Sequence, residues 1–258
     1  MIRIKNDEQI RRMAESGKVT GRILEELEGF IQPGITTLDI DNFVEEQIRK
    51  EGMIPTFKGY NGFPASACVS VNEVLVHGIP NTAQILKEGD IVSVDVGATH
   101  KGWVSDAART YAVGRISEEA ARLIAVCKQS FFEGLRYCRA GNRLTDIGHA
   151  IQVYVEENGF SVVLDYVGHG VGSKMHEDPQ VRNYGEAGKG PVLQKGMALA
   201  IEPMINEGVA EVVTSEEDGW SVRTRDGKLA AHYENTVIIT DGNPLVITLG
   251  SADQSSIS

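Results

Sequence analysis

SVDVGATHKGWVSDAAR, residues 93–109, is the stretch around which the rest of the chain is organised. It predicts a β-hairpin that carries one carboxylate on each strand. The first arm, 91–96, is rich in β-branched residues and alternates, and the second, 103–107, returns after a turn that contains a glycine.

The register of this hairpin decides whether its two acids face each other. With His100 and Lys101 as a two-residue loop, Asp95 is expected directly opposite Asp106, with the two Cβ atoms about 5 Å apart. Two carboxylates held that close and shielded from water have to share a proton or bind a cation. A surface hairpin with two solvated acids is the alternative, because a slip of one residue turns Asp106 to the other face.

Length and composition limit the class of protein. The chain has 258 residues, of which 41% are apolar, so it can form one or two globular domains with a sizeable core. Acidic residues outnumber basic ones by 36 − 25 = 11, which disfavours a stable nucleic-acid partner. No apolar run approaches the ~18 residues of a membrane span, and the N-terminus lacks the apolar core of a signal peptide. The three cysteines form no CxxC pair and are expected as free thiols, so we expect a cytoplasmic protein without a membrane partner.

Two helical patterns precede the hairpin. Asn6 is a suitable cap for a helix over 6–30, and a second capping box opens a helix that ends at Gly52. Gly17 and Gly21 lie on the apolar stripe of the first helix. We therefore expect this helix to pack closely against another element.

The same plan recurs after residue 117, where a long helix to about Cys138 is followed by a second helix that ends at Gly159. The residues that match at an offset of 107 positions are Gly34 with Gly141, Asp39 with Asp146, Ile40 with Ile147, Gly52 with Gly159, Gly89 with Gly196, and Asp95 with Glu202. Because these matches fall on equivalent elements, they predict an internal duplication. Chance similarity between two capped amphipathic helices is the alternative.

The expected architecture is an α+β fold in which two pairs of helices back one curved, mainly antiparallel sheet. The duplication implies pseudo-twofold symmetry, which would bring the acids of the two halves together. We expect a single domain over 1–250, with pseudo-repeats 1–115 and 116–250, and a flexible tail over 251–258.

Three further residues have the character of metal ligands. His169 lies in the glycine-rich loop VGHGVG, Glu202 ends an apolar strand before a proline, and Glu234 lies in the β-branched run HYENTVII. Each alone is more often structural, because a loop histidine or a solvated acid looks the same in sequence. Together with Asp95 and Asp106 they make four carboxylates and one imidazole. This donor set suits Mn, Fe, Co or Zn and can hold two ions through bridging carboxylates.

Sequence motifs of other catalytic classes are missing or incomplete. The chain contains no GxSxG nucleophile elbow. Residues 168–174 fit neither the Walker spacing nor GxGxxG, and HEDPQ at 176–180 lacks the second histidine of HExxH.

At these residues the chain resembles the type I methionine aminopeptidases of the bacterial kind, in metallopeptidase family M24. The resemblance covers almost the whole chain. It rests on SVNEVLVHGIP (70–80), DVGATHKGWVSDAART (95–110), GHGVGSKMHEDP (168–179), MALAIEPMI (197–205) and HYENTVIIT (232–240). It implies the duplicated pita-bread fold, in agreement with the repeat above. It also implies removal of the initiator methionine from nascent proteins whose second residue is small.

The resemblance implies a centre of two divalent ions. Asp106 and Glu234 would bridge the ions, Asp95 would hold one of them, and His169 with Glu202 would hold the other. The ions would come from Co, Mn, Fe, Zn and Ni, and the sequence does not choose among them.

It also implies three catalytic residues. Glu202 would act as general base and general acid. His77 and His176 would contact the substrate and the developing oxyanion, although an ordinary loop histidine is the alternative for each.

The implied pocket for the methionine side chain is mainly aromatic. Its residues are Tyr60, Phe63, Cys68 and Trp220, with Phe57 and Met175 nearby, and the implied substrate-binding residues also include His77 and His176. Phe57, Phe63 and Met175 depart from the usual family pattern, which leaves fine specificity and inhibitor preference open. Plain core packing is the alternative for each of these residues.

The implied partners are the N-terminal methionine of nascent peptides and, transiently, the ribosome, with the protein as a monomer. A non-catalytic pita-bread module that binds peptides or RNA is one alternative, and the complete ligand set disfavours it. A proline dipeptidase with the same metal centre is another. The methionine pocket and the lack of a matching N-terminal domain disfavour that alternative.

Overall fold

The computed structural model describes residues 1–250, so the tail predicted over 251–258 lies outside the described residues. The helices are α1 (Asp7–Phe30), α2 (Thr37–Lys50), α3 (Glu118–Leu135) and α4 (Leu144–Glu157), with a short 3₁₀ turn at Tyr60–Gly62. The strands are β1 (Ile54–Pro55), β2 (Ala67–Val71), β3 (Val74–Val76), β4 (Ile91–His100), β5 (Trp103–Ala112), β6 (Ser161–Val162), β7 (Gly168–Gly170), β8 (Glu177–Val181), β9 (Ala198–Ile201), β10 (Met204–Asn206), β11 (Val212–Thr214), β12 (Val222–Thr224), β13 (Ala230–His232), β14 (Asn235–Ile238) and β15 (Leu245–Val246).

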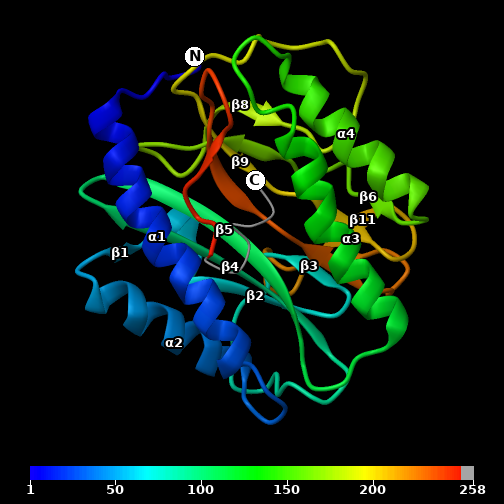
Figure 1. The fold of residues 1–258 in the computed structure, drawn as a ribbon. Coiled ribbons are helices and arrows are strands. Elements are labelled where there is room, and N and C mark those ends of the chain that lie inside the picture. The colour runs from blue at the N-terminus through cyan, green and yellow to red at the C-terminus, as the bar shows by residue number, and fades with distance from the viewer. Residues whose placement is uncertain (251–258) are drawn as a thin grey trace.

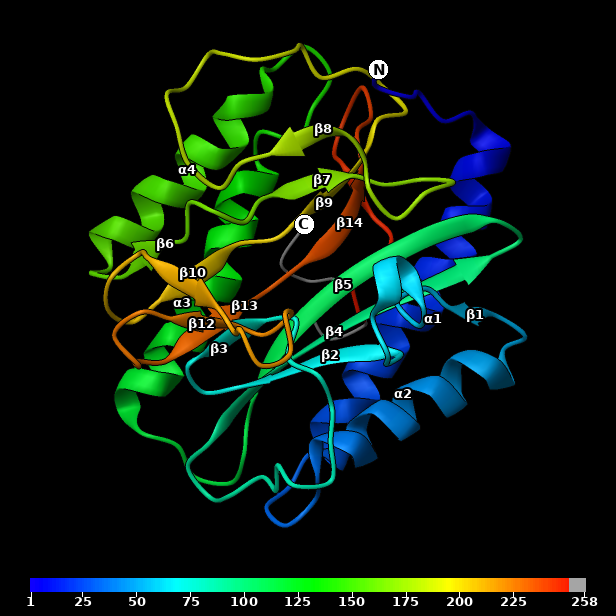
Figure 2. The same cartoon turned by 180° about the vertical axis from the view of Figure 1, so that it is seen from behind.

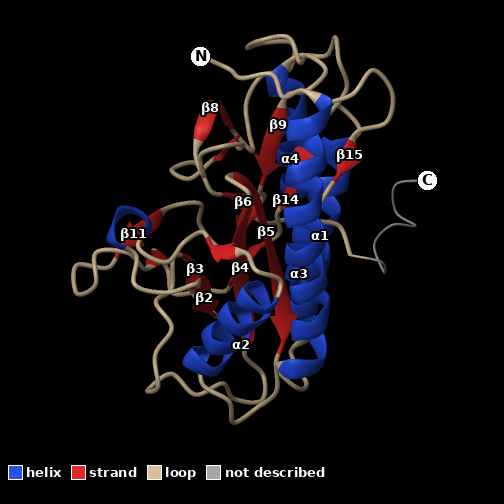
Figure 3. Ribbon diagram, turned by 90° about the vertical axis from the view of Figure 1, so that its left-hand side faces the viewer, coloured by secondary structure: helices blue, strands red, loops and turns tan. Residues whose placement is uncertain are grey.

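Helices and strands form separate layers, as the predicted α+β fold requires. In Figure 1, α1, α3 and α4 lie in front of the strands and α2 lies below them, and Figure 2 shows the strands from the opposite side. In Figure 3, α1, α3 and α4 all lie on the same side of the strand layer. None of the helices over 1–250 combines the length and the apolar character needed to cross a membrane.

The predicted helix starts are confirmed, because local side-chain bonds fix them. Asn6 and Gln9 form a reciprocal capping box at α1. Thr36 and Asp39 do the same at α2, and the Ser117 side chain accepts a hydrogen bond from the backbone at the start of α3.

The expected close approach at the two glycines of α1 is also confirmed. A Cβ added at Gly17 would lie 2.4 Å from the Ile247 carbonyl oxygen, and one at Gly21 would lie 2.6 Å from the Thr248 carbonyl oxygen. The C-terminal segment therefore packs directly on the helix backbone.

Every strand ladder over 1–250 is antiparallel, and the ladders form four hydrogen-bonded sheets. One sheet belongs to the N-terminal half and has the order β1-β4-β2, with β5 paired to β4. Another, β15-β14-β9-β7-β8, belongs to the C-terminal half. Separate apolar clusters pack under α1 and α2 and under α3 and α4, so each half has its own core.

The predicted register of the β4–β5 hairpin is wrong by two residues in the pairing. His100 pairs with Trp103, so the two-residue loop is Lys101–Gly102, and Asp106 lies opposite Gly97 instead of Asp95. Both loop residues have positive φ, 47° and 79°, which matches the turn that the twist of a hairpin favours. Because Asp95 and Gly97 are two residues apart, Asp95 and Asp106 still share a face, as diagonal neighbours.

The two halves repeat the same local structure at the predicted offset. Gly34 N–H donates to the Leu86 carbonyl at 2.8 Å, and its counterpart Gly141 N–H donates to the Leu193 carbonyl at 3.0 Å. The two glycines have φ values of 98° and 99°, which residues other than glycine rarely adopt. We propose from these repeated contacts that the chain forms one domain from duplicated halves, 1–115 and 116–250.

The halves meet where β5 lies beside β14. The backbone groups of Ala108 and Glu234 exchange two hydrogen bonds of 3.3 and 3.0 Å. The Thr236 hydroxyl donates to the Asp106 carbonyl and accepts from the Asp106 N–H, both at 2.9 Å. This junction brings an acid of each half to the centre of the molecule.

Candidate metal centre and substrate pocket

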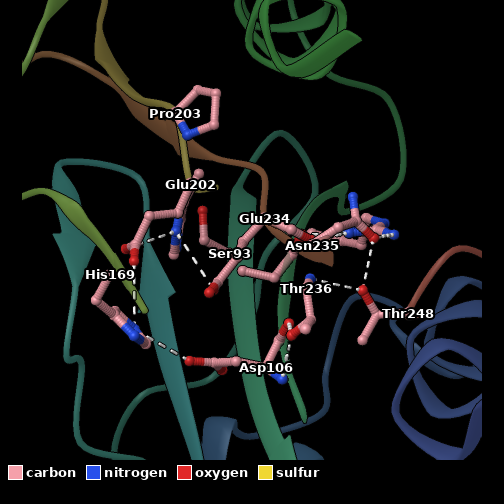
Figure 4. A network of polar contacts seen from close by, with 12 residues as sticks. Ser93, Asp106, His169, Glu202, Pro203, Glu234, Asn235, Thr236 and Thr248 are labelled. Carbon is pink, nitrogen blue, oxygen red and sulfur yellow. Dashed lines mark hydrogen bonds and ion pairs between the residues drawn. The ribbon is translucent and has the colours of Figure 1, made fainter. Parts of the chain in front are cut away.

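The four predicted carboxylates converge from both halves of the fold. Asp95 and Asp106 lie within β4 and β5, Glu202 directly follows β9, and Glu234 lies between β13 and β14. Glu202 therefore ends a strand, as the sequence predicts, and Asp95 and Asp106 lie one on each strand of the hairpin. Figure 4 shows Asp106, Glu202 and Glu234 pointing toward one another.

His169 lies at the middle of strand β7 and not in the predicted tight loop. The glycines beside it serve close strand packing, because a Cβ at Gly168 would lie 2.4 Å from the Ala200 carbonyl oxygen and one at Gly170 would lie 2.1 Å from the Asp178 carbonyl oxygen. β7 can therefore fit between β8 and β9 and hold the imidazole at the centre.

The imidazole of His169 lies between two of the carboxylates. Its Nε2 is 3.5 Å from Asp106 Oδ2 and 3.6 Å from Glu202 Oε1 (Figure 4). Its Nδ1 lies 2.9 Å from the Gly170 carbonyl oxygen. If that bond holds the proton on Nδ1, the lone pair of Nε2 points to the carboxylates, which is the arrangement of a histidine ligand.

Burial shifts the proton affinities of the whole cluster. It raises the pKa of Asp106 to about 7. The pKa values of Asp95, Glu202 and Glu234 are well above the usual range, because burial and then the neighbouring carboxylates penalise the charged forms. Burial also lowers the pKa of His169 to about 4, so this imidazole is neutral at physiological pH.

The residues present fit a metal centre. Within 1–250, Asp95 Oδ1, Asp106 Oδ1 and Glu234 Oε1 are enclosed and accept no hydrogen bond. Enclosed carboxylate oxygens without partners are costly unless a cation neutralises them. Asp106, His169 and Glu234 each offer a ligand atom, and these three atoms lie within 4.8 Å of one another.

All residues predicted for the site line one cavity with a volume of about 260 Å³. The predicted residues on its wall are Phe57, Tyr60, Phe63, Cys68, His77, Asp95, Asp106, His169, Met175, His176, Glu202, Trp220 and Glu234. The residues that the sequence analysis assigns to one site therefore line one cavity in the structure.

One wall of the cavity is aromatic. The rings of Phe63 and Trp220 meet edge to face with their centroids 5.2 Å apart. On the other side, Tyr60 Oη lies 2.8 Å from His176 Nδ1, and the His176 ring lies 4.2 Å from the His169 ring. The cavity thus has an apolar part next to a carboxylate and imidazole part.

Sequence reasoning missed other lining residues, which are Asn61, Val76, Tyr166, Val167, Met204 and His232. His232 is the most consequential, because its Nε2 lies 3.6 Å from Glu202 Oε2 and burial lowers its pKa to about 3. The signal was present: His232 lies two residues before Glu234, and side chains alternate along extended chain.

Comparison with known proteins gives consistent matches over nearly the full chain. A model of metallopeptidase family M24 matches residues 11–241. A methionine aminopeptidase of Clostridium acetobutylicum is 57% identical over 249 residues, covering 96% of this chain and 99% of that one. One from Escherichia coli K12 is 40% identical over 253 residues, covering 98% and 96%. The crystal structure of methionine aminopeptidase from Thermotoga maritima matches with a TM-score of 0.95 and 47% identity, covering 96% of this chain and 100% of that chain.

Proposed function

The chain belongs to metallopeptidase family M24, among the type I methionine aminopeptidases of the bacterial kind, and on that basis we propose that it removes the initiator methionine at a centre of two divalent ions held by Asp95, Asp106, His169, Glu202 and Glu234. The observation that carries the proposal is the cluster of enclosed carboxylate oxygens on the cavity wall, which accept no hydrogen bond from residues 1–250.

The proposed ligands form three groups according to their place in the fold. Asp106 of β5 and Glu234, just before β14, come from the neighbouring segments that join the halves, which suits bridging carboxylates. Asp95 would hold one ion, and His169 with Glu202 the other. Bound ions of this kind act as Lewis acids and lower the pKa of water to near neutrality. Co, Mn, Fe, Zn and Ni are all compatible with these donors.

Glu202 is the proposed general base and acid. Its side chain is 12% exposed and reaches the cavity between two imidazoles, and its pKa lies well above the usual range. A carboxylate with raised proton affinity can accept the proton of the attacking water and deliver it to the leaving amine.

His176 and His77 are proposed to act on the substrate. The contact of Tyr60 Oη with Nδ1 orients the His176 ring and leaves Nε2 free to stabilise the oxyanion. His77 has a φ of 59°, an unusual value for a residue with a side chain, and lies on the cavity wall. Such strain is often retained where a side chain must point at a ligand.

The aromatic part of the cavity is proposed to hold the methionine side chain. Phe63 and Trp220 offer ring edges and faces to a thioether, a favourable contact for sulfur. Steric restriction by the cavity wall is proposed to limit the second residue to small types. Action on nascent chains in the cytoplasm, transient contact with the ribosome and a monomeric state complete the proposal.

We expect methionine release to need both metal and a free amino group. Protein stripped of metal should release no methionine from Met-Gly-Met-Met, and added Co²⁺ or Mn²⁺ should restore release, because the enclosed carboxylates need a cation. The N-acetylated peptide should not be cleaved, since its blocked amine cannot bind the centre. Chromatography of the products measures both. Efficient release of acetyl-methionine would contradict this binding mode, and no release by folded protein with any metal would favour a non-catalytic binding module.

We expect His77→Ala to lower kcat by about 10²-fold, the usual effect of losing one proton-transferring or oxyanion-binding group. Metal content should stay at the wild-type level, because His77 is not among the proposed ligands. Steady-state kinetics and elemental analysis of the same sample test this. Unchanged turnover would remove His77 from the mechanism.

A further inference from the structure

His232 lies against the side of the centre opposite His169, and the proposed ligand set does not use it. Its side chain is 2% exposed, and its Nε2 lies 3.6 Å from Glu202 Oε2 and 3.9 Å from Glu234 Oε2. Among the described residues this nitrogen has no hydrogen-bond partner. A buried imidazole nitrogen between two carboxylates, too far from either for a hydrogen bond, needs a physical explanation.

The distances fit ligands of a common ion. An ion bound at ~2.1 Å from each ligand atom keeps any two of those atoms within ~4.2 Å of each other. The separations from Nε2 to the two carboxylates are inside that limit, and the ligand atoms of Glu202, His232 and Glu234 all lie within 4.8 Å of one another.

The two oxygens of Glu202 each face one imidazole. Oε1 lies 3.6 Å from His169 Nε2, and Oε2 lies 3.6 Å from His232 Nε2. Glu202 is thus flanked by a histidine of strand β7 and a histidine of strand β13. His232 therefore lies as close to Glu202 as His169 does. The resemblance already assigns His169 as a ligand.

We propose that His232 is a sixth ligand of the metal centre, binding through Nε2 on the side of Glu202 and Glu234. The inference rests on the proposed dinuclear centre and adds a second nitrogen ligand to it. Imidazole suits Zn, Cu, Fe and Ni, whereas carboxylates suit Mg, Ca and Mn, and the affinity of a nitrogen-containing site rises from Mn²⁺ to Co²⁺. The added imidazole therefore biases the site that contains Glu202 toward Co²⁺ or Zn²⁺ and away from Mn²⁺.

Titration of metal-stripped protein with Co²⁺ tests the proposal, with calorimetry and the visible absorption of bound Co²⁺ as readouts. We expect His232→Gln to weaken one of the two binding steps by at least about tenfold, the lower range for losing a group that supports a metal site. The absorption bands of bound Co²⁺ should change, and Mn²⁺ binding should weaken less. His77→Gln is the matched control, because it removes another imidazole from the cavity wall and should leave the isotherm and the spectrum unchanged.

Proton NMR of the Co²⁺-loaded wild-type protein tests the same point without a variant. A ligated histidine shows a strongly shifted, exchangeable ring N–H signal, so two such signals are expected, one from His169 and one from His232. A single signal, or wild-type binding and spectrum in folded His232→Gln, would overturn the proposal. Failure of the wild-type protein to bind any Co²⁺ would instead overturn the proposed centre itself.

Discussion

Glu202→Gln is expected to lower methionine release by at least ~10³-fold, within the range for losing a general acid–base group. The amide has nearly the size and shape of the carboxylate, so the fold around β9 should persist. It can neither accept a proton from water nor neutralise a cation. The variant therefore loses the proposed proton acceptor and one proposed charged ligand together.

The measurement is kcat on Met-Gly-Met-Met at saturating metal, with far-ultraviolet circular dichroism to confirm folding. Asp41→Asn is the matched control, because Asp41 is a buried carboxyl outside the cavity, and its amide replacement can still accept the hydrogen bonds from Ser66 and Ala67 N–H. The control should retain activity within a few-fold. Turnover by Glu202→Gln near the wild-type rate would refute the assignment of Glu202 as the base.

Features set by local residues could be predicted from the sequence. The caps at Asn6 and Thr36 act on backbone groups within the same turn, so a few residues suffice to place a helix start. Gly34 and Gly141 mark positions of positive φ, and their identical spacing from the following capping box revealed the repeat. The pairing of acids across the halves followed from this repeat without any knowledge of the sheet.

The hairpin register depends on the backbone angles of the loop, which the apolar pattern of the two strands does not contain. A two-residue turn of the favoured type needs positive φ at both positions, and a glycine second in the loop is the usual sign. Lys101–Gly102 meets that condition, whereas the loop His100–Lys101 contains no glycine. The predicted grouping of Asp95 and Asp106 is unaffected by this error. Moving the loop by one residue along the chain changes the pairing by two residues and keeps both acids on one face.

The environments of His169 and His232 depend on contacts that are distant in sequence. The glycines beside His169 indicate a flexible loop as readily as they indicate close strand packing, and only the positions of Ala200 and Asp178 decide between the two. His232 approaches Glu202 because β13 pairs with β10, which sets His232 opposite Met204. The residue pattern within β10 or β13 alone does not predict that these two strands pair.

Asp106→Asn is expected to abolish metal-dependent activity and yet to stabilise the metal-free protein at neutral pH. In the folded metal-free state, burial raises the pKa of Asp106 to about 7, whereas an aspartate in an unfolded chain titrates near pH ~4. The folded state therefore binds this proton more tightly. The resulting stability is fully present below pH ~4 and is lost as the pH rises toward 7.

Asparagine has no such proton to lose, so the free energies of unfolding of the two proteins should diverge between pH 4 and pH 7. The advantage of the variant over wild type should grow steadily as the pH rises through this window, to roughly a few kcal/mol at pH 7. Urea unfolding of metal-free samples measures the difference. Glu216→Gln, which neutralises an exposed carboxylate, should follow the wild-type curve.

Adding Mn²⁺ should reverse the order at pH 7. Ions that bind only the folded wild type stabilise it by ~4.1 kcal/mol per site at a thousand times the dissociation constant, and a variant without the Asp106 carboxylate should gain much less. A metal-free variant less stable than wild type at pH 7 would contradict the argument. The expected crossing would show that the carboxylates destabilise the fold when they lie together unliganded and that the cation offsets this cost, which ties the stability of the protein to the centre that performs its chemistry.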